Sequence, residues 1–357
     1  MGKEMVQLEN IWQDYGLDEL EAGMQTLFPE YDISLPTLLE EVLAGDILGA
    51  MAHFLEGIIS GMAISATGMK NIFVWLLVLG VVAALMTHFI EIFDKHQVAD
   101  LGFYFIYLLM TAVLLKCFSG IMTTAADTIE NIVLFVKLLV PTYLLSVGLA
   151  TGTTTVSAYY QLLLLLIYGA EKILVGVVIP LVYSQCLLSL INGIWVEEKL
   201  NLLINLLEKA TGWMLKAAIG IVTGISIFQA VVTPVIDSVK ASSLQKVISA
   251  IPGVGNAADG VVELVIGSAV VIKNSIGIVL LILLLVLCAA PLLQIFSVAI
   301  LLKGAAALMG LVSNKRITAC VDRTGDACML LFRTAGTAMF LFLITLSIVA
   351  TATNRGF

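Results

Sequence analysis

The feature that most constrains this chain is a series of uncharged apolar runs, each long enough to cross a lipid bilayer as a helix. One of them extends from Asn274 to Leu302 and contains no Asp, Glu, Lys or Arg. A crossing takes about 20 helical residues, because the hydrocarbon layer is about 30 Å thick and a helix rises about 1.5 Å per residue. The runs lack the period-two alternation of an outer-membrane barrel. The sequence therefore predicts an all-α, polytopic helical membrane protein.

The composition agrees with this class, since 60% of the 357 residues are hydrophobic and only 12% are charged. An ordinary soluble domain carries about 25% charged residues. We count seven or eight crossings. The number depends on the run from Asn274 to Leu302, which fits one tilted crossing or, with a sharp turn at Pro291, a tight pair.

Charged positions between the apolar runs are expected to be turns and loops. An acidic turn at Asp127 and Glu130 is predicted to separate a crossing at Leu101–Met122 from one at Ile132–Ala150. A basic loop precedes the final crossing, and by the positive-inside rule we expect this loop to face the cytoplasm. Its basic residues are Lys315, Arg316, Arg323 and Arg333.

The charge of the chain divides it into two regions. Residues 1–70 hold 12 acidic residues against Lys3 and Lys70, a balance of −10, so the net charge of −8 leaves +2 for residues 71–357. Apolar stripes at helical spacing run through the acidic region, and its first thirty residues contain no secretory signal. We expect an amphipathic helical N-terminal region at 1–70 that binds partner proteins outside the cytoplasm, followed by a multispanning domain at 71–357. The alternatives are that the region is cytoplasmic and that its helices pack only against one another.

Two segments interrupt the apolar pattern and are predicted to be broken or re-entrant. Between Lys246 and Asn274, Pro252, Gly253 and Gly255 make a plain helix unfavourable, since proline lacks an amide donor and glycine has a low helix propensity. Non-helical backbone at membrane depth persists only where protein or a wet cavity surrounds it. We therefore expect these segments to form the working core of the protein. The alternative is that they are surface loops whose glycines occupy turns.

The second interrupted segment extends from Leu138 to Gln161. Its proline and glycines lie beside a run of hydroxyl residues, again between apolar runs. Glu171 lies inside a further apolar block, and an acid at membrane depth is a candidate functional residue. The predicted channel-core residues are Pro141, Gly148, Gly152, Glu171, Pro252, Gly253, Gly255, Asp259 and Lys273.

Several kinds of chemistry have no support in the sequence. It contains no HExxH, GxSxG or P-loop lysine motif, so we expect no enzyme, no catalytic residue and no cofactor. Cys320 and Cys328 have no histidine near them in the sequence, and we expect no metal site there. The acidic balance makes nucleic acid an unfavourable partner.

Four ordered motifs carry a resemblance to a known family. They are PTYLLSVGLATGTTTVSAYYQ at 141–161, IPGVGNAADG at 251–260, GSAVVIKN at 267–274 and SNKRI at 313–317. Together with the acidic helical N-terminal region, they resemble the stage III sporulation protein AE family of endospore-forming bacteria. The resemblance covers nearly the whole chain from about residue 60, although members usually begin with a signal peptide that this chain lacks.

The resemblance implies a membrane subunit of the complex that joins mother cell and forespore after engulfment and acts as a secretion or feeding channel. It implies a place in the mother-cell membrane facing the forespore, with the bilayer and the other subunits of the stage III complex as partners. The family has no established catalytic residues. From the residues alone, a secondary transporter for a small solute is the alternative, because paired broken helices are typical of transporters.

Overall fold

The computed structural model describes five stretches of the chain, namely residues 96–151, 172–194, 199–248, 288–311 and 315–352. It also describes isolated positions at 49, 52, 74, 78, 81, 82, 85, 166, 169, 170, 278, 279, 282, 284 and 285. The regular structure of these residues is helical throughout, without a strand. The elements are α5 (His96–Thr151), η1 (Leu174–Val178), α7 (Ile179–Asn192), α8 (Asn201–Ile248), the helix Cys288–Met309 and α10 (Lys315–Ala352).

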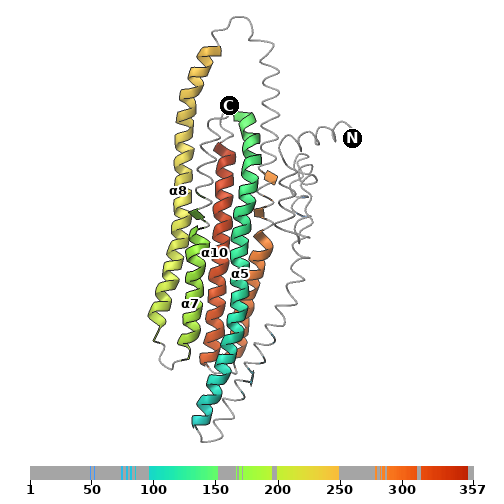
Figure 1. Cartoon of the computed structure of the whole chain (residues 1–357), viewed down its shortest axis with the longest axis vertical. Coiled ribbons are helices and arrows are strands. Elements are labelled where there is room, and N and C mark those ends of the chain that lie inside the picture. Colours follow the sequence, from blue (N-terminus) through green and yellow to red (C-terminus); the bar gives the residue numbers. More distant parts are fainter. Residues whose placement is uncertain are drawn as a thin grey trace.

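The long helices lie side by side along the long axis of the molecule (Figure 1). In the same view α5, α8 and α10 run in one direction and α7 runs in the other. α10 is the central element, because it contacts α5, α7 and α8, and the ring of Phe332 on α10 lies 5.1 Å from that of Phe296 on the helix Cys288–Met309. The described part of the chain is therefore a bundle built around α10.

The core follows the helical period of the sequence. On α5 buried side chains recur every three or four residues, with Ile106 and Cys117 buried beside them, and on α10 buried residues recur at the same interval, singly or as adjacent pairs. These positions are Tyr107, Met110, Leu114, Phe118 and Ile121 on α5, and Ile317, Cys320, Val321, Thr324, Ala327, Cys328 and Leu331 on α10. Lipid tails are about as apolar as leucine, so helix association in a bilayer depends on close packing and on polar contacts more than on the hydrophobic effect.

The described part of the chain contains four helices that are long and apolar enough to cross a membrane. They are Leu101–Phe135, Leu174–Asn192, Cys288–Met309 and Lys315–Ile344. This confirms the predicted all-helical fold for the described residues and gives four candidate membrane-spanning helices. The expected total of seven or eight stays a prediction, because much of the chain lies outside the described residues.

The acidic turn predicted at Asp127 and Glu130 is wrong, because α5 runs through both residues as one helix of 56 residues. No glycine or proline occurs between residues 121 and 140, so nothing in the backbone chemistry requires a break. Both acids lie on the exposed face of α5, and the helix continues through them. Two expected crossings are thus parts of one helix.

The interruption predicted at Pro141 and Gly148 also needs correction, since α5 continues through both and ends at Thr151. Proline costs the helix one hydrogen bond, to the carbonyl four residues earlier, and membrane helices tolerate this where other groups satisfy that carbonyl. The remainder of that segment, with Gly152, lies outside the described residues.

The basic loop is a further correction, because Lys315, Arg316, Arg323 and Arg333 all lie on α10. Helical spacing of the small and apolar residues between these charges places one face of α10 in the core. Pro291 lies within the helix Cys288–Met309, which excludes the turn that a tight pair of crossings would need there.

Pro180 disturbs its helix locally without ending it. The five-residue π-helix η1 precedes α7, and the N–H of Ile179 donates to the carbonyl of Leu174. Pro180 follows at the start of α7, where its missing N–H is tolerated. The wider π turn accommodates a proline in a membrane helix at this point.

Candidate functional site

Most of the predicted channel-core residues lie outside the described residues, so their role stays a prediction. This holds for Gly152, Glu171, Pro252, Gly253, Gly255, Asp259 and Lys273, and for nearly all of the N-terminal region 1–70. Pro141 and Gly148 are placed on the backbone of α5, but their burial and contacts lie outside what the structure describes. The charged residues that the structure brings together are different ones, on α10 and the helix Cys288–Met309.

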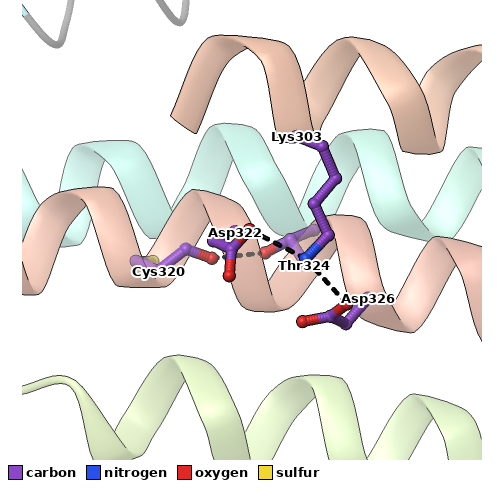
Figure 2. Close-up of polar contacts among 5 residues, drawn as sticks. All are labelled: Lys303, Cys320, Asp322, Thr324 and Asp326. Atoms are coloured by element: carbon purple, nitrogen blue, oxygen red, sulfur yellow. Dashed lines mark hydrogen bonds and ion pairs between the residues drawn. The ribbon is translucent and has the colours of Figure 1, made fainter. Parts of the chain in front are cut away.

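A lysine and two aspartates form an ion-pair cluster between two apolar helices. The Nζ atom of Lys303 lies 2.8 Å from Oδ1 of Asp322 and 2.7 Å from Oδ1 of Asp326. Figure 2 shows the lysine side chain crossing from the helix Cys288–Met309 toward α10 and ending between the two carboxylates. We call these three residues the charge cluster.

The helical geometry of α10 explains why one lysine reaches both acids. Asp322 and Asp326 are four residues apart, so their side chains project from the same face of the helix. The two helices approach closely at Gly325, where an added Cβ would lie 3.2 Å from Cγ of Lys303 and 3.4 Å from the carbonyl oxygen of Ala299. A small residue at a crossing point is typical of packed membrane helices.

The charge cluster is only partly covered and its charge is not balanced. The side chains of Lys303, Asp322 and Asp326 are 38%, 47% and 55% exposed, respectively. Two carboxylates against one ammonium group leave a formal charge of −1. Charged residues in membrane helices usually pair with one another and face protein or water. The cluster therefore joins two helices and presents an anionic surface to whatever lies beside it.

Thr324, between the two aspartates in the sequence, is buried and bonds within its own helix, whereas the aspartates are partly exposed and pair with another helix. Its side chain is fully buried and its hydroxyl donates to the carbonyl oxygen of Cys320, at 2.9 Å (Figure 2). This bond satisfies a polar group inside the bundle without a second helix. α10 thus turns a neutral face inward and the charge cluster outward.

A second polar group closes one end of the bundle, and we call Tyr107, Gly193 and Arg316 the end lock. The hydroxyl of Tyr107 donates to the carbonyl oxygen of Leu190, at 2.6 Å. The Nη2 atom of Arg316 donates to the carbonyl oxygens of Gly193, at 3.0 Å, and Ile194. The last carbonyls of a helix have no intrahelical partner, so these side chains satisfy the end of α7 from α5 and α10.

Two further contacts support the same end. The guanidinium carbon of Arg316 lies 4.4 Å from the centre of the Phe103 ring, a cation–π contact. In the turn from α7 to α8, Asn192 Oδ1 accepts from the N–H of Leu200, at 2.9 Å, and its Nδ2 donates to Oδ1 of Asn201, at 2.8 Å. The end lock and the contacts of Asn192 together join α5, α7, α8 and α10.

Neither group forms a candidate metal site. Among the residues that the structure describes, no three His, Cys, Asp or Glu side chains lie close enough together to hold a metal ion. The described cysteines Cys117, Cys186, Cys288, Cys320 and Cys328 are all free and buried. The expectation that the protein is not an enzyme stays a prediction.

Sequence reasoning missed the charge cluster, although part of its signal is present in the sequence. Asp322 and Asp326 have the four-residue spacing of one helix face, but they lie within the segment predicted to be a basic loop. Lys303 comes directly after the uncharged run that ends at Leu302. The ion pairs of Lys303 depend on how its helix packs against α10, and no local sequence pattern predicts that packing.

The sequence of the chain matches one known protein family. Residues 33–353 match the family described as stage III sporulation protein AE. The chain is also similar to the stage III sporulation protein AE of Bacillus subtilis strain 168, at 20% identity over 317 residues, which is 88% of this chain and 79% of that protein. No solved structure gives a significant match.

Proposed function

The chain belongs to the stage III sporulation protein AE family, and from this premise we propose that it is a membrane subunit of the complex that connects mother cell and forespore during sporulation. In this proposal it takes part in secretion or feeding through a channel in the mother-cell membrane that faces the forespore. Its partners are the other subunits of that stage III complex, and its role is not catalytic.

The family match over residues 33–353 carries this proposal. The geometry supports it, because a bundle that presents a partly exposed anionic cluster on apolar helices suits a protein with neighbours in the membrane. A transporter has less support than the sequence suggested. Paired broken helices were its main argument, and α5 runs unbroken through Pro141 and Gly148.

The proposal is tested by depleting the protein in its native host during sporulation. We expect engulfment to finish, late forespore gene activity to fail and spore yield to collapse, with recovery when the unaltered chain is supplied from another locus. Normal spore yield after verified depletion would contradict the proposal.

A second measurement addresses the assembly. The tagged chain, extracted in mild detergent from sporulating cells, is expected to migrate with other membrane proteins in a complex larger than its own detergent-bound monomer. The same extraction from cells that express the chain during growth serves as the control. Migration as a monomer from both cultures would contradict the role as a complex subunit.

A further inference from the structure

Two polar atoms inside the bundle, one on α7 and one on α8, have no hydrogen-bond partner among the residues that the structure describes. They are Oε1 of Gln185 and Oγ1 of Thr211. Gln185 is only 4% exposed and Thr211 is fully buried. A buried polar atom without a partner is costly, so most such atoms in proteins bond to another group or to ordered water.

The hydroxyl of Thr211 differs from those of three other buried threonines. The hydroxyls of Thr128, Thr324 and Thr334 each donate to the carbonyl oxygen four residues earlier in their own helix. Thr211 makes no such bond, although α8 begins ten residues before it and continues well beyond it. Its hydroxyl is therefore available to a group that does not belong to α8.

Both residues lie on faces that the bundle buries. Gln185 is seven residues before Asn192 and so shares its face of α7, and Asn192 bonds to Asn201 of α8. Thr211 is in line with Leu215, which packs in the common core. Each of α7, α8 and α10 contacts the other two. Three helices in mutual contact leave no room for another helix between them, so a partner for the two atoms must be small.

The bond between Asn192 and Asn201 also sets the relative heights of the two residues. α7 and α8 run in opposite directions (Figure 1), so ten residues forward from Asn201 to Thr211 correspond to ten residues back from Asn192. That position is three residues from Gln185, or about 4.5 Å along the axis at 1.5 Å per residue. A single water can bridge atoms about 5 Å apart, because each of its hydrogen bonds is about 2.8 Å long.

α10 contributes small side chains at this height. Arg316 donates to the carbonyl of Gly193, and α10 and α7 run in opposite directions, so the level of Gln185 on α10 is eight residues beyond Arg316. The buried residues that follow this level are Gly325, Ala327 and Cys328. A water needs polar partners and space of its own size, and small neighbours favour that space.

We propose that an ordered water molecule lies between α7 and α8, donates a hydrogen bond to Oε1 of Gln185 and accepts one from the hydroxyl of Thr211. The ligand is water and not an ion, because neither side chain carries a charge to balance that of an ion. Gln185 belongs to the apolar span Leu174–Asn192, where hydrocarbon around the bundle offers no hydrogen bond. The water joins α7 to α8 far from their connecting turn.

Thermal unfolding of the purified chain in detergent tests this bridge by the sign of the change. Thr211→Val keeps the shape of the side chain and removes its hydroxyl. We expect the unfolding midpoint to fall by about 2–4 °C, because the water loses one of its partners. A hydroxyl without any partner would give no fall or a rise, since an apolar group of the same shape is then at least as stable. Thr334→Val is the matched control and should leave the midpoint unchanged, because that hydroxyl bonds to its own helix.

Gln185→Met tests the other end of the bridge. This variant should also lower the midpoint, and the double variant with Thr211→Val should lower it by less than the sum of the single changes, because each removes a bond to the same water. A midpoint that fails to fall in either single variant, or falls that are strictly additive, would overturn the shared water.

Radiolytic footprinting distinguishes a water from a direct hydrogen bond between the two side chains. A short X-ray pulse turns water, including water inside a protein, into hydroxyl radicals that oxidise the nearest side chains. Cys186, next to Gln185, is the reporter, and Cys288 is the matched control, because both are free and 1% exposed. We expect Cys186 to be oxidised faster than Cys288 in the parent and at the same rate as Cys288 in the double variant.

Equal oxidation of the two cysteines in the parent would overturn the water, even if the unfolding midpoints show that Gln185 and Thr211 are coupled. That combination would assign the coupling to a direct bond between the two side chains. Both measurements use the purified chain, so their outcome does not depend on the role of the protein in sporulation.

Discussion

The end lock and the charge cluster use the same helix in opposite ways. Arg316 of the end lock donates to backbone carbonyls beside a buried tyrosine. Asp322, less than two turns further along α10, pairs with Lys303 at a site where all side chains are more than a third exposed. The charge of Arg316, at the end of α7, therefore stabilises the fold. The excess negative charge of the cluster is partly exposed and can pair with a neighbouring molecule.

The energetics of the two groups differ for the same reason. If one partner of a buried hydrogen bond is removed, the other partner stays buried and finds no hydrogen-bond partner in solvent or protein. Exposed ion pairs contribute little, because water and salt compete for both charges. We therefore expect changes in the end lock to destabilise the fold and changes in the charge cluster to leave it nearly intact.

The largest effect is expected for Arg316→Met, which removes every hydrogen bond to the carbonyls of Gly193 and Ile194 and the contact with Phe103. Loss of these charge-assisted bonds should lower the free energy of unfolding by about 3 kcal/mol. Thermal unfolding of the purified chain in detergent measures this. Arg316→Lys is the matched control and should recover part of the loss, since lysine keeps the charge but not the two-pronged geometry. Equal stability of the Met variant and the parent would remove the distinction between the two groups.

Gly193→Ala should follow, because its new Cβ would lie 3.0 Å from Cζ of Tyr107 and closer still to its hydroxyl oxygen. Gly193 has φ of −72°, so alanine meets no backbone strain and the cost is steric alone. We expect a loss of about 2 kcal/mol from overpacking. Tyr107→Phe removes the clashing hydroxyl, so the double variant should lose less than the sum of the two single losses. A strictly additive result would show that the ring moves aside freely.

The sequence predicted the class of the fold well and its boundaries poorly. Apolar length and helical period are local properties, so the crossings and the core face of α5 follow from them. Charge alone does not identify a loop, so the prediction of a turn at Asp127 and Glu130 is wrong. The residues around them contain no glycine or proline, so nothing in the sequence requires the helix to break there.

The candidate site was less accessible to sequence reasoning. Arg316 meets carbonyls of Gly193 and Ile194, more than a hundred residues earlier, and no local pattern specifies such a pairing. Lys303 and Asp322 are closer in sequence, but their contact requires the tight helix crossing at Gly325. The interpretation of Pro141 as a break failed for a related reason, since the surroundings of a proline decide whether a helix continues through it.

Lys303→Met tests how much the charge cluster contributes to stability. It removes both ion pairs but keeps the packing of Phe296 against Phe332, which joins the same two helices. We expect a loss of about 1 kcal/mol or less in the free energy of unfolding in detergent. Lys303→Arg is the matched control and should stay within experimental error of the parent. A loss as large as that of Arg316→Met would show that the charge cluster is a structural element equal to the end lock.

The smallest effects are expected for Asp322→Asn and Asp326→Asn taken singly. Each leaves Lys303 one carboxylate at an ion-pair distance, and each removes the repulsion between two like charges four residues apart on α10. The change in free energy of unfolding should therefore stay below about 0.5 kcal/mol for either variant. The double variant leaves Lys303 without a carboxylate from either residue, so its loss in free energy of unfolding should exceed the sum of the single losses.

The amount by which the double loss exceeds that sum should shrink as salt is raised, because mobile ions screen partly exposed charges. The Arg316→Met loss should barely change over the same range, and salt dependence of equal size at both places would refute the contrast between them.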